Sequence, residues 1–316
     1  DMDALPILEA NQVEYRSTRD GVMHACGHDV HTSSLLGVAG ILHELRDRFE
    51  GTVKLIFQPG EEKVPGGASL MIRDGVLQSP APISVLGQHV MPQLPAGKVG
   101  FRKGLYMASA DELYLTIRGK GGHGAMPHTV IDPVMIAAQV LVSLQQVVSR
   151  FAKPSVPTVL SFGKVVADGA TNVIPDHVRL EGTFRTLDER WREEAHRRMR
   201  AVVEGIVSSM GGTCDFEIRK GYPFLVNDEP LTERTRRWAE EYVGAENIED
   251  LEIWMASEDF AYYSQQVPSC FYRLGVRNEA RGIVSSVHTP TFDVDESSLE
   301  LGVGLMAWLA LKELEG

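Results

Sequence analysis

The apolar positions in the first third of the chain predict both helix and strand. From His31 to Leu45 they recur at helical spacing, which predicts an amphipathic helix. Two short β-rich runs, 53–57 and 83–86, predict strands. Because helix and strand alternate, we expect an α/β domain with a mixed, mostly parallel sheet and flanking helices. Sites in such sheets lie at the carboxyl ends of strands, so the loops after Phe57 and Leu86 are the places to look for chemistry.

The middle of the chain has a different pattern. Strands are predicted at 112–118, 156–162, 177–185 and 214–218. Helices are predicted after two capping aspartates, Asp132, which precedes a proline, and Asp188, and the second helix ends at a Gly-Gly pair. The resulting order, β-α-β-β-α-β, is that of a ferredoxin-like α+β unit, which is compact enough to be inserted into another domain.

The last part of the chain returns to the α/β pattern. It predicts a helix at 231–242, a short strand at 252–255 and a closing helix at 299–313. The length of 316 residues is typical of about two domains. We therefore expect a discontinuous catalytic domain, 1–110 and 223–316, interrupted by a second domain at 111–222.

Composition excludes several classes of function. The chain carries 31 Lys+Arg against 43 Asp+Glu, a net charge of −12, so neither nucleic acid nor an anionic membrane is expected as a partner. No apolar run is long enough to predict a transmembrane helix. The cysteines are Cys26, Cys214 and Cys270, too few and too scattered for a disulfide framework. A reducing, cytoplasmic location is the expectation.

Possible metal ligands are found in four separate connections. In the segment MHACGHDVH, a thiol and an imidazole flank a glycine, and both groups are preferred ligands of transition metals. Adjacent carboxylates follow the predicted strand at 53–57, and such a pair can divide its roles between metal binding and general base catalysis. Further histidines follow the strand at 83–86 and lie in a Ser- and Pro-rich loop near the end. The candidates are Cys26, His28, Glu61, Glu62, His89 and His288.

Each candidate alone also has an ordinary structural explanation: a buried thiol beside a helix cap, a solvated acidic loop, or a surface histidine. Their combination favours a metal site, because sulfur, nitrogen and oxygen ligands come from separate connections of one α/β domain. The five that would bind metal are Cys26, His28, Glu62, His89 and His288. A closed structural zinc site uses four ligands, so five suit a binuclear hydrolytic site in which two metals share one ligand.

Motifs along the whole chain resemble those of one enzyme family. They are DMDALP, GVMHACGHDVH, FQPGEE with GGA, GQHV, GKGGHGAMPH, NVIPD, GTFRT, SEDF and VHTPTFDVDE, in this order. The chain resembles the N-acyl-amino-acid amidohydrolases, which include hippurate hydrolase and the indole-acetyl-amino-acid hydrolases. These belong to the aminoacylase and carboxypeptidase G clan of binuclear metallopeptidases. The resemblance implies a catalytic α/β domain interrupted by a smaller lid, which also forms the interface of a homodimer.

The resemblance also implies roles for individual residues. Cys26 matches the bridging metal ligand and Glu61 the general base. His123, in GGHGAMPH, matches a lid histidine that donates a hydrogen bond to the developing oxyanion, in related enzymes at the partner subunit's site. Asn172 and Arg185 match lid residues near the free carboxylate of the substrate. Asp3 and Asp29 are expected to contact the metal ligands and orient them without binding metal themselves.

The implied reaction is hydrolysis of the amide bond of an N-acyl-L-amino acid by a metal-bridged hydroxide with a glutamate as base. It releases a carboxylic acid and a free amino acid. Two divalent metals per subunit are expected, with zinc or manganese favoured and cobalt or nickel compatible with the same ligands.

Three other functions remain open. A dipeptidase or carboxypeptidase of the same clan would act on the same amide and carboxylate. A non-catalytic relative would bind a ligand by domain closure. A cysteine hydrolase would use Cys26 as nucleophile, but it leaves the remaining candidates without a role.

The chain departs from the family pattern in two places. Gly60 stands where the family more often has alanine, in the loop that aims both glutamates. The family also has some tens of residues before DMDALP, including a helix and a strand, so we expect the working enzyme to be longer than this chain.

Overall fold

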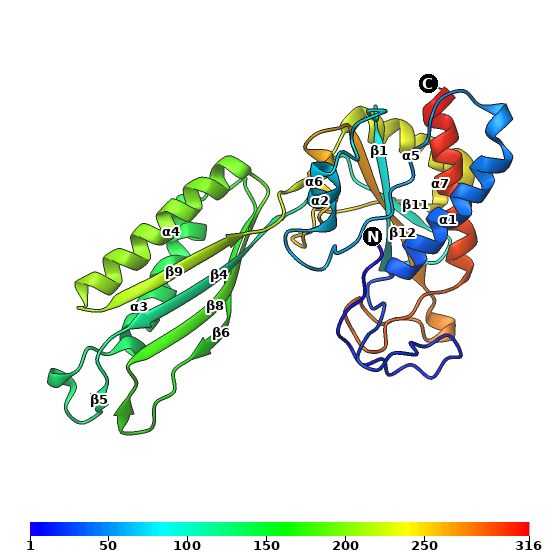
Figure 1. Cartoon of the computed structure of the whole chain (residues 1–316). Helices are drawn as coiled ribbons and strands as arrows, with labels where there is room; N and C mark the ends of the chain where they lie inside the picture. Colours follow the sequence, from blue (N-terminus) through cyan, green and yellow to red (C-terminus); the bar gives the residue numbers. More distant parts are fainter. Residues whose placement is uncertain (316) are drawn as a thin grey trace. The chain divides into compact units, whose positions relative to one another are not determined.

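The computed structural model describes residues 1–315 and divides into two compact units (Figure 1). The first unit comprises Asp1–Tyr106, Leu225–Ile253 and Asp259–Gly316, with the final glycine outside the described residues. The second unit comprises Met107–Phe224 and Trp254–Glu258. The short segment Trp254–Glu258 thus packs with the second unit, although the sequence analysis placed it in the flanking α/β region.

The first unit is built on a mixed four-stranded sheet, as predicted. Its strands lie in the order β1-β12-β2-β11, and their bounds are β1 Val85–Pro95, β12 Ser269–Arg277, β2 Val99–Phe101 and β11 Ile248–Asp250. The outer pairs β1/β12 and β11/β2 are parallel, and only β12/β2 is antiparallel. A second, two-stranded sheet joins β3 (Gly104–Met107) to β10 (Leu225–Asn227).

Helices cover this sheet and bury its central strand. Helices α1 (His28–Glu44) and α7 (Ser297–Glu315) lie side by side against β1 and β12, and α5 (Glu229–Val243) packs beside α7 (Figure 1). Eight of the nine residues of β12 are buried, which is typical of a strand covered on both faces. The remaining elements are short: α2 Gly67–Arg73, α6 Ala261–Ser264, η1 Arg46–Arg48, η4 Ala245–Asn247 and η5 Glu279–Arg281.

Two strand predictions for the flanking α/β segments were wrong, and a third strand is longer than predicted. Residues 53–57 pair with no strand among residues 1–315, and a strand needs a hydrogen-bonded neighbour. In place of a strand at 252–255 there is a single bridge between Trp254 and Met107. The run at 83–86 is the start of the longer β1, so His89 lies within a strand and not in the loop after it. Strand β12 was not predicted, because its uniform burial gives no alternation.

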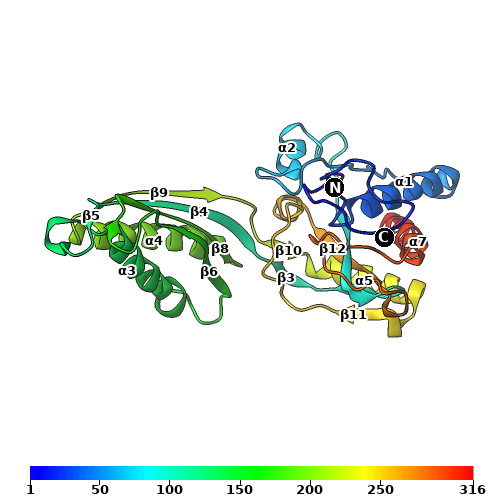
Figure 2. The same ribbon diagram turned by 90° about the horizontal axis from the view of Figure 1, so that it is seen from below.

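The second unit has the predicted β-α-β-β-α-β order. Its antiparallel sheet runs β6-β8-β4-β9, and α3 and α4 cover one face (Figure 2). The bounds are β4 Ser109–Arg118, α3 Pro133–Gln146, β6 Thr158–Val166, β8 His177–Thr186, α4 Glu189–Ser209 and β9 Thr213–Lys220. A small sheet joins β5 (Gly122–His123) to β7 (Val173–Ile174), and the other elements are η2 Pro127–Thr129 and the π-turn η3 Val147–Phe151.

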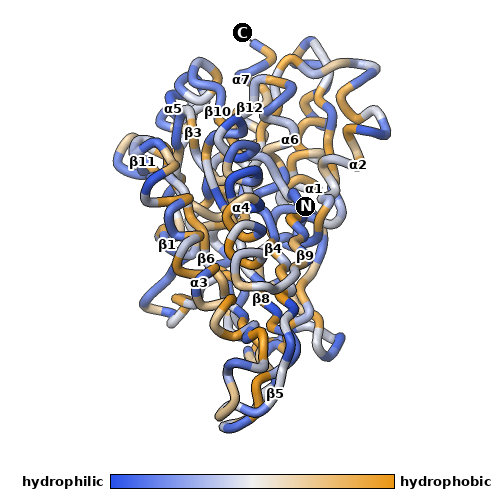
Figure 3. Tube along the Cα trace, turned by 90° about the vertical axis from the view of Figure 1, so that its left-hand side faces the viewer, coloured by the Kyte–Doolittle hydropathy of each residue, from blue (hydrophilic) through white to orange (hydrophobic). Residues whose placement is uncertain are grey.

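Side-chain alternation and capping explain this unit. Along β4, Leu113, Leu115 and Ile117 are buried in the core beneath the helices while their neighbours are more exposed. Figure 3, which colours the chain by hydropathy, shows apolar and polar positions interspersed along the trace. Asp132 accepts the N–H groups of Val134 and Met135 and so caps α3. The capping aspartate of α4 likewise accepts a backbone N–H from the first turn.

Helix α3 and the turn after it have an unusual surface. Among residues 1–315, Pro133–Phe151 is the one helical stretch long and apolar enough to cross a membrane by length and composition alone. One face of this stretch, with Ile136 and Val140, is fully buried in the core of the second unit. On the other face Met135 is 51% and Val142 72% exposed. The second unit therefore presents an apolar helix face to its surroundings.

Candidate metal centre and active site

The structure brings the five predicted metal ligands of the first unit together. Ligand atoms of Cys26, His28 and Glu62 all lie within 4.8 Å of one another. Cys26 Sγ is 3.6 Å from His89 Nε2. His288 Nε2 is 3.0 Å from a carboxylate oxygen of Glu62. Four connections that are distant in sequence therefore supply one cluster.

A glycine makes the Cys26–His28 turn possible. Gly27 has φ of 78°, in the left-handed region, and immediately precedes helix α1. A Cβ at this position would lie 2.5 Å from Cγ2 of Val90 on strand β1. Because residue 27 has no side chain, the turn packs directly on β1. The thiol of Cys26 and the imidazole of His28 therefore lie near His89, which is also on β1.

The hydrogen bonds of His89 leave one ring nitrogen for a metal. Its Nδ1 lies 2.7 Å from the carbonyl oxygen of Val90, so Nδ1 carries the proton and Nε2, which faces Cys26, has the lone pair. Burial, followed by the positive charge of Arg273 and the neighbouring histidines, lowers the pKa of His89 well below its ordinary value. A neutral imidazole is the form that binds a metal.

His31 has the opposite arrangement. Its Nε2 accepts the N–H of Val90 at 2.9 Å, and its Nδ1 lies 2.6 Å from the carboxylate of Asp1. Both ring nitrogens are therefore occupied, although Asp1, His28, His31 and His89 together place their ligand atoms within 4.8 Å of one another. His31 holds β1 against α1, a contact that its place on the predicted helix did not reveal.

Asp3 holds the two glutamates. Its carboxylate oxygens accept the N–H groups of Glu61 and Glu62, each at 2.9 Å, and one of them lies 3.3 Å from Nδ1 of His28. Burial alone would raise the pKa of Asp3, but the contacts with His28 and with the two amides lower it below its ordinary value. Asp29 is not part of the cluster: it is exposed, and its carboxylate accepts the N–H of Val30 in its own helix.

Unsatisfied buried atoms indicate that the cluster fits a metal. Both ring nitrogens of His28 and one carboxylate oxygen of Glu62 are buried without a hydrogen bond of good geometry, although charged neighbours lie 3.0–3.4 Å away. Buried polar atoms without partners are costly, and divalent cations would satisfy both residues. The donor set of sulfur, nitrogen and oxygen suits transition metals.

His288 closes the cluster from a strained loop. Its φ of 61° is unusual for a residue other than glycine, and its N–H donates to the carbonyl of Ala25 at 2.7 Å. The hydrogen bond places the loop beside the Cys26 turn. Its side chain faces Glu62, and this contact raises the pKa of His288.

Glu61 is buried beside a second carboxylate that the sequence analysis left without a role. Glu61 is 7% exposed, and an oxygen of its carboxylate lies within 4.8 Å of one of Asp259. Asp259 is fully buried, accepts Gln58 Nε2 at 2.6 Å and accepts the N–H of Ala68 at 2.9 Å. Burial raises the pKa of Asp259 to about 6. Only its place in the motif SEDF pointed to it in the sequence.

In the second unit, His123 and Asn172 lie together. Strands β5 and β7 pair His123 with Val173, and the N–H of Gly124 donates to the carbonyl of Asn172 at 2.8 Å. His123 is exposed, and its Nδ1 accepts the N–H of Ala125 at 3.1 Å. The proton is therefore on Nε2, which points the donor of this imidazole away from its own backbone.

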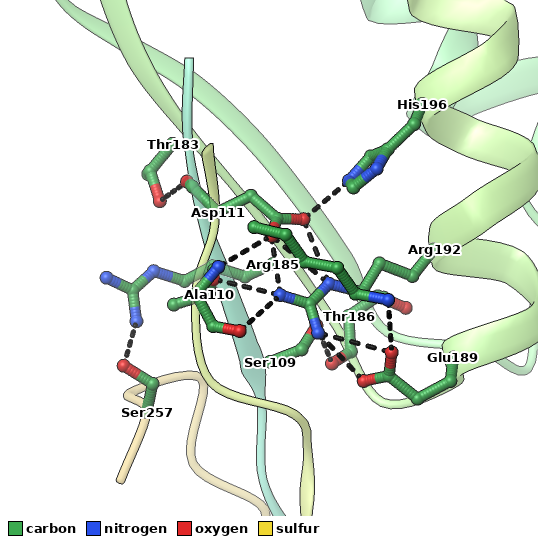
Figure 4. A network of polar contacts seen from close by, with 12 residues as sticks. Ser109, Ala110, Asp111, Thr183, Arg185, Thr186, Glu189, Arg192, His196 and Ser257 are labelled. Atoms are coloured by element: carbon green, nitrogen blue, oxygen red, sulfur yellow. Dashed lines mark hydrogen bonds and ion pairs between the residues drawn. The ribbon is translucent and has the colours of Figure 1, made fainter. Parts of the chain in front are cut away.

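Arg185 lies near the other end of the same unit, beside a buried ionic network (Figure 4). Its Nη1 donates to the carbonyl of Met255 at 3.2 Å and approaches Oγ of Ser257 at 3.5 Å. Burial lowers the pKa of Arg185. On the helix side of the sheet, Arg192 is fully buried and pairs with Asp111.

The network ties the ends of neighbouring strands to α4. Arg192 Nη2 donates to the carbonyls of Ala110 and Gly221, both at 3.1 Å, and Nε donates to both carboxylate oxygens of Asp111. His196 Nε2 lies 2.6 Å from the same carboxylate. Since Ala110 pairs with Arg185 in the sheet, this network fixes the strand from which Arg185 projects.

Asn172 and Arg185 do not meet within one copy of the second unit. Strand β8 starts at His177, just after β7, and Arg185 is eight residues along it. At about 3.3 Å per residue, the two ends are about 26 Å apart. A single small substrate cannot contact both residues of the same copy.

Comparison with known proteins agrees with this geometry. A family model described as peptidase family M20/M25/M40 matches residues 1–312. The chain is 39% identical to IAA-amino acid hydrolase ILR1-like 4 of Arabidopsis thaliana, covering 99% of this chain and 72% of that protein. It is 38% identical to thermostable carboxypeptidase 2 of Saccharolobus solfataricus, covering 99% and 79%, and 37% identical to N-acetylcysteine deacetylase of Bacillus subtilis, covering 100% and 80%.

A solved structure is similar over the same range. The Bacillus subtilis YXEP protein, described as a dinuclear metal-binding peptidase from the M20 family, matches with a TM-score of 0.80 and 33% identity. The match covers 99% of this chain and 79% of that chain.

Proposed function

Because the chain belongs to peptidase family M20/M25/M40 and is a hydrolase, we propose that it cleaves the amide bond of N-acyl amino acids and releases a carboxylic acid and a free amino acid. The observation that carries the proposal is the placement of Glu61 beside Glu62, with both amides held by Asp3. A buried carboxylate next to a metal-ligand cluster is suited to moving a proton at the reacting centre. The names of two relatives, an IAA-amino acid hydrolase and an N-acetylcysteine deacetylase, support this substrate class.

The same cluster would hold two divalent metal ions, as the description of the YXEP protein supports. The residues that would bind them are Cys26, His28, Glu62, His89 and His288, with Cys26 in the shared position. Such ions polarise a carbonyl and make water acidic enough to attack it near neutral pH. Zinc or manganese is the proposed metal, since both accept this mixture of ligands.

The residues of the chain then have distinct tasks. Glu61 takes a proton from the attacking water and returns it to the leaving nitrogen. His123, with its donor on Nε2, hydrogen-bonds the oxygen that becomes negative during the attack. Arg185 binds the substrate carboxylate, because a planar guanidinium can donate to both carboxylate oxygens, and Asn172 assists from the other side.

We further propose that the enzyme works as a homodimer through the second unit. Strand β8 spans about 26 Å from His177 to Arg185, and His123 and Asn172 lie at β5 and β7, before that strand begins, so a second copy would supply His123 and Asn172 to the substrate that Arg185 binds. The exposed apolar face of α3, with Met135 and Val142, and the edge strand β6 offer a surface for this pairing. A required thiolate at Cys26 favours a reducing compartment such as the cytoplasm.

A substrate panel and two variants test the function. Acetyl-, benzoyl- and indole-acetyl-amino acids are compared with dipeptides, and kcat/KM decides between the proposed activity and a carboxypeptidase, the activity named for one relative. Glu61→Gln should keep the metal content and lose most of kcat, and a near-normal kcat would refute the assignment of the base. Cys26→Ser should lose metal, and retention of both ions at full rate would exclude a bridging cysteine.

A further inference from the structure

The two glutamates of the active site lie on a loop whose ends almost touch. The loop runs from Gln58 to Ala68, and the N–H of Gly67 donates to the carbonyl of Gly60 at 3.2 Å. A Cβ on Gly67 would lie 1.5 Å from the carbonyl oxygen of Pro59, so only glycine permits this approach. We call the two ends of the loop, 58–60 and 67–68, its neck. The orientation of the glutamates depends on how firmly the two sides of this neck are held together.

Asp259 spans the neck from a distant part of the chain. One carboxylate oxygen accepts Gln58 Nε2 at 2.6 Å, just before the glutamates, and the other accepts the N–H of Ala68 at 2.9 Å, just after them. Asp259 is fully buried and Gln58 is 6% exposed, so water competes little for either hydrogen bond.

Asp3 acts at the tip of the same loop, where its carboxylate accepts the N–H groups of Glu61 and Glu62. The loop is thus fixed by one carboxylate at its tip and by another at its neck. The hydrogen bonds of Asp3 orient the backbone of the glutamates, but they do not hold the two sides of the neck together. Besides the single backbone hydrogen bond from Gly67 to Gly60, the two sides are joined by the side-chain bridge through Asp259.

We propose that Asp259 is a positioning residue for the general base, acting through Gln58 and Ala68 to keep Glu61 in a single orientation. The inference rests on the proposed role of Glu61. Asp259 itself takes no part in the proton transfer. A displacement of about 1 Å at a reacting group can cost on the order of 10²-fold in rate, so opening the neck should be visible in kcat.

Three variants separate positioning from general stability. Asp259→Ala removes both hydrogen bonds, and we expect kcat to fall about 10- to 100-fold with KM within about twofold of wild type. Asp259→Asn should recover much of kcat, since its oxygen can accept the N–H of Ala68 and its amide can donate to the oxygen of a flipped Gln58. Gln58→Met removes one side of the bridge and should lie between them.

Asn227→Ala is the matched control. Asn227 is also fully buried in the first unit, and it makes three hydrogen bonds to the backbone of Arg102 and Phe271 and none to the loop 58–68. It should lower the melting temperature as Asp259→Ala does, yet leave kcat of the folded enzyme unchanged.

Hydrogen exchange of the peptide 58–68 gives a readout that does not depend on activity. Asp259→Ala should speed exchange in this peptide and leave that of strand β12 unchanged, whereas Asn227→Ala should leave the loop protected. Normal kcat with unchanged loop exchange in Asp259→Ala would overturn the proposal, and so would uniform loss of protection in both strand and loop. If the wild-type enzyme hydrolysed nothing in the substrate panel, the proposed function would fail, while the exchange experiment would still decide whether Asp259 holds the loop.

Discussion

The substitution Gly27→Ala tests the turn that separates two proposed ligands. Two penalties are expected to add. The φ of 78° costs a residue with a Cβ about 1–2 kcal/mol. The new Cβ would lie 2.5 Å from Cγ2 of Val90, and overpacking of this kind costs about 1–3 kcal/mol. Together they predict a loss of about 2–5 kcal/mol in the free energy of unfolding.

A second substitution separates the two penalties. Val90→Ala removes the clashing methyl groups but cannot change φ at residue 27, so in the double variant the overpacking part should disappear. The coupling energy between the two sites should therefore be about 1–3 kcal/mol in the stabilising direction. Urea denaturation of the metal-free protein measures each corner of the cycle, and metal titration then measures the loss of affinity that a displaced turn causes.

Gly40→Ala provides the control in the same helix. Gly40 lies inside α1, is exposed, has no positive φ, and an added Cβ would meet no atom within 4 Å. An alanine here should stabilise the helix by about 0.5–1 kcal/mol. A cost below about 1 kcal/mol for Gly27→Ala, or a cycle without coupling, would show that the turn relaxes and that close packing on β1 does not set its position.

Three further predictions concern the buried charges of the two units. Asp111→Asn leaves the buried Arg192 with Glu189 as its remaining charged partner, and the free energy of unfolding measured in urea should fall, by at most about 3–5 kcal/mol. Although burial opposes it, contact with His196 and Arg192 lowers the pKa of Asp111 from 3.8, so its stabilisation is complete above that pH and is lost as pH falls through the folded value. Acid unfolding of the wild type should therefore steepen below about pH 3.8, and that of Asp111→Asn should not. Removal of metal by a chelator should lower the melting temperature, because His28 and Glu62 then keep buried atoms without partners, and calorimetry with and without added zinc would detect no difference if the cluster bound none.

The predicted elements that the structure confirms are those whose signals are local. Helices α3 and α4 begin at Asp132 and Asp188, whose side chains accept backbone N–H groups in the first turn. Strand β4 shows the alternation of a sheet with one covered face. Cap geometry and alternation depend on neighbouring residues only, so the sequence is sufficient for both.

Elements that depend on distant partners were not predictable in the same way. Strand β12 is buried on both faces and carries a buried arginine, Arg273, so neither alternation nor polarity marks it. Residues 53–57 have the composition of a strand, but without a hydrogen-bonded neighbour within residues 1–315 they form no strand. Strand pairing is a property of two segments and cannot be deduced from one.

The same distinction applies to the site. Candidate ligands could be named from residue type, because thiolate, imidazole and carboxylate bind metals wherever they occur. Asp259 and His31 act through hydrogen bonds to residues far away in sequence, and nothing in their own neighbourhood specifies the partner. Their roles follow only from the folded structure.

Asn172 and Arg185 are close in sequence but not in space. The family resemblance implied that both lie near the substrate carboxylate, but most of the residues between them form β8, and a strand places its ends far apart. At about 3.3 Å per residue the strand spans about 26 Å from His177 to Arg185, several times the length of an amino acid. If both contact one substrate carboxylate, they must come from different copies of the chain. The length of strand β8 is therefore the structural basis of the proposal that the enzyme works as a homodimer.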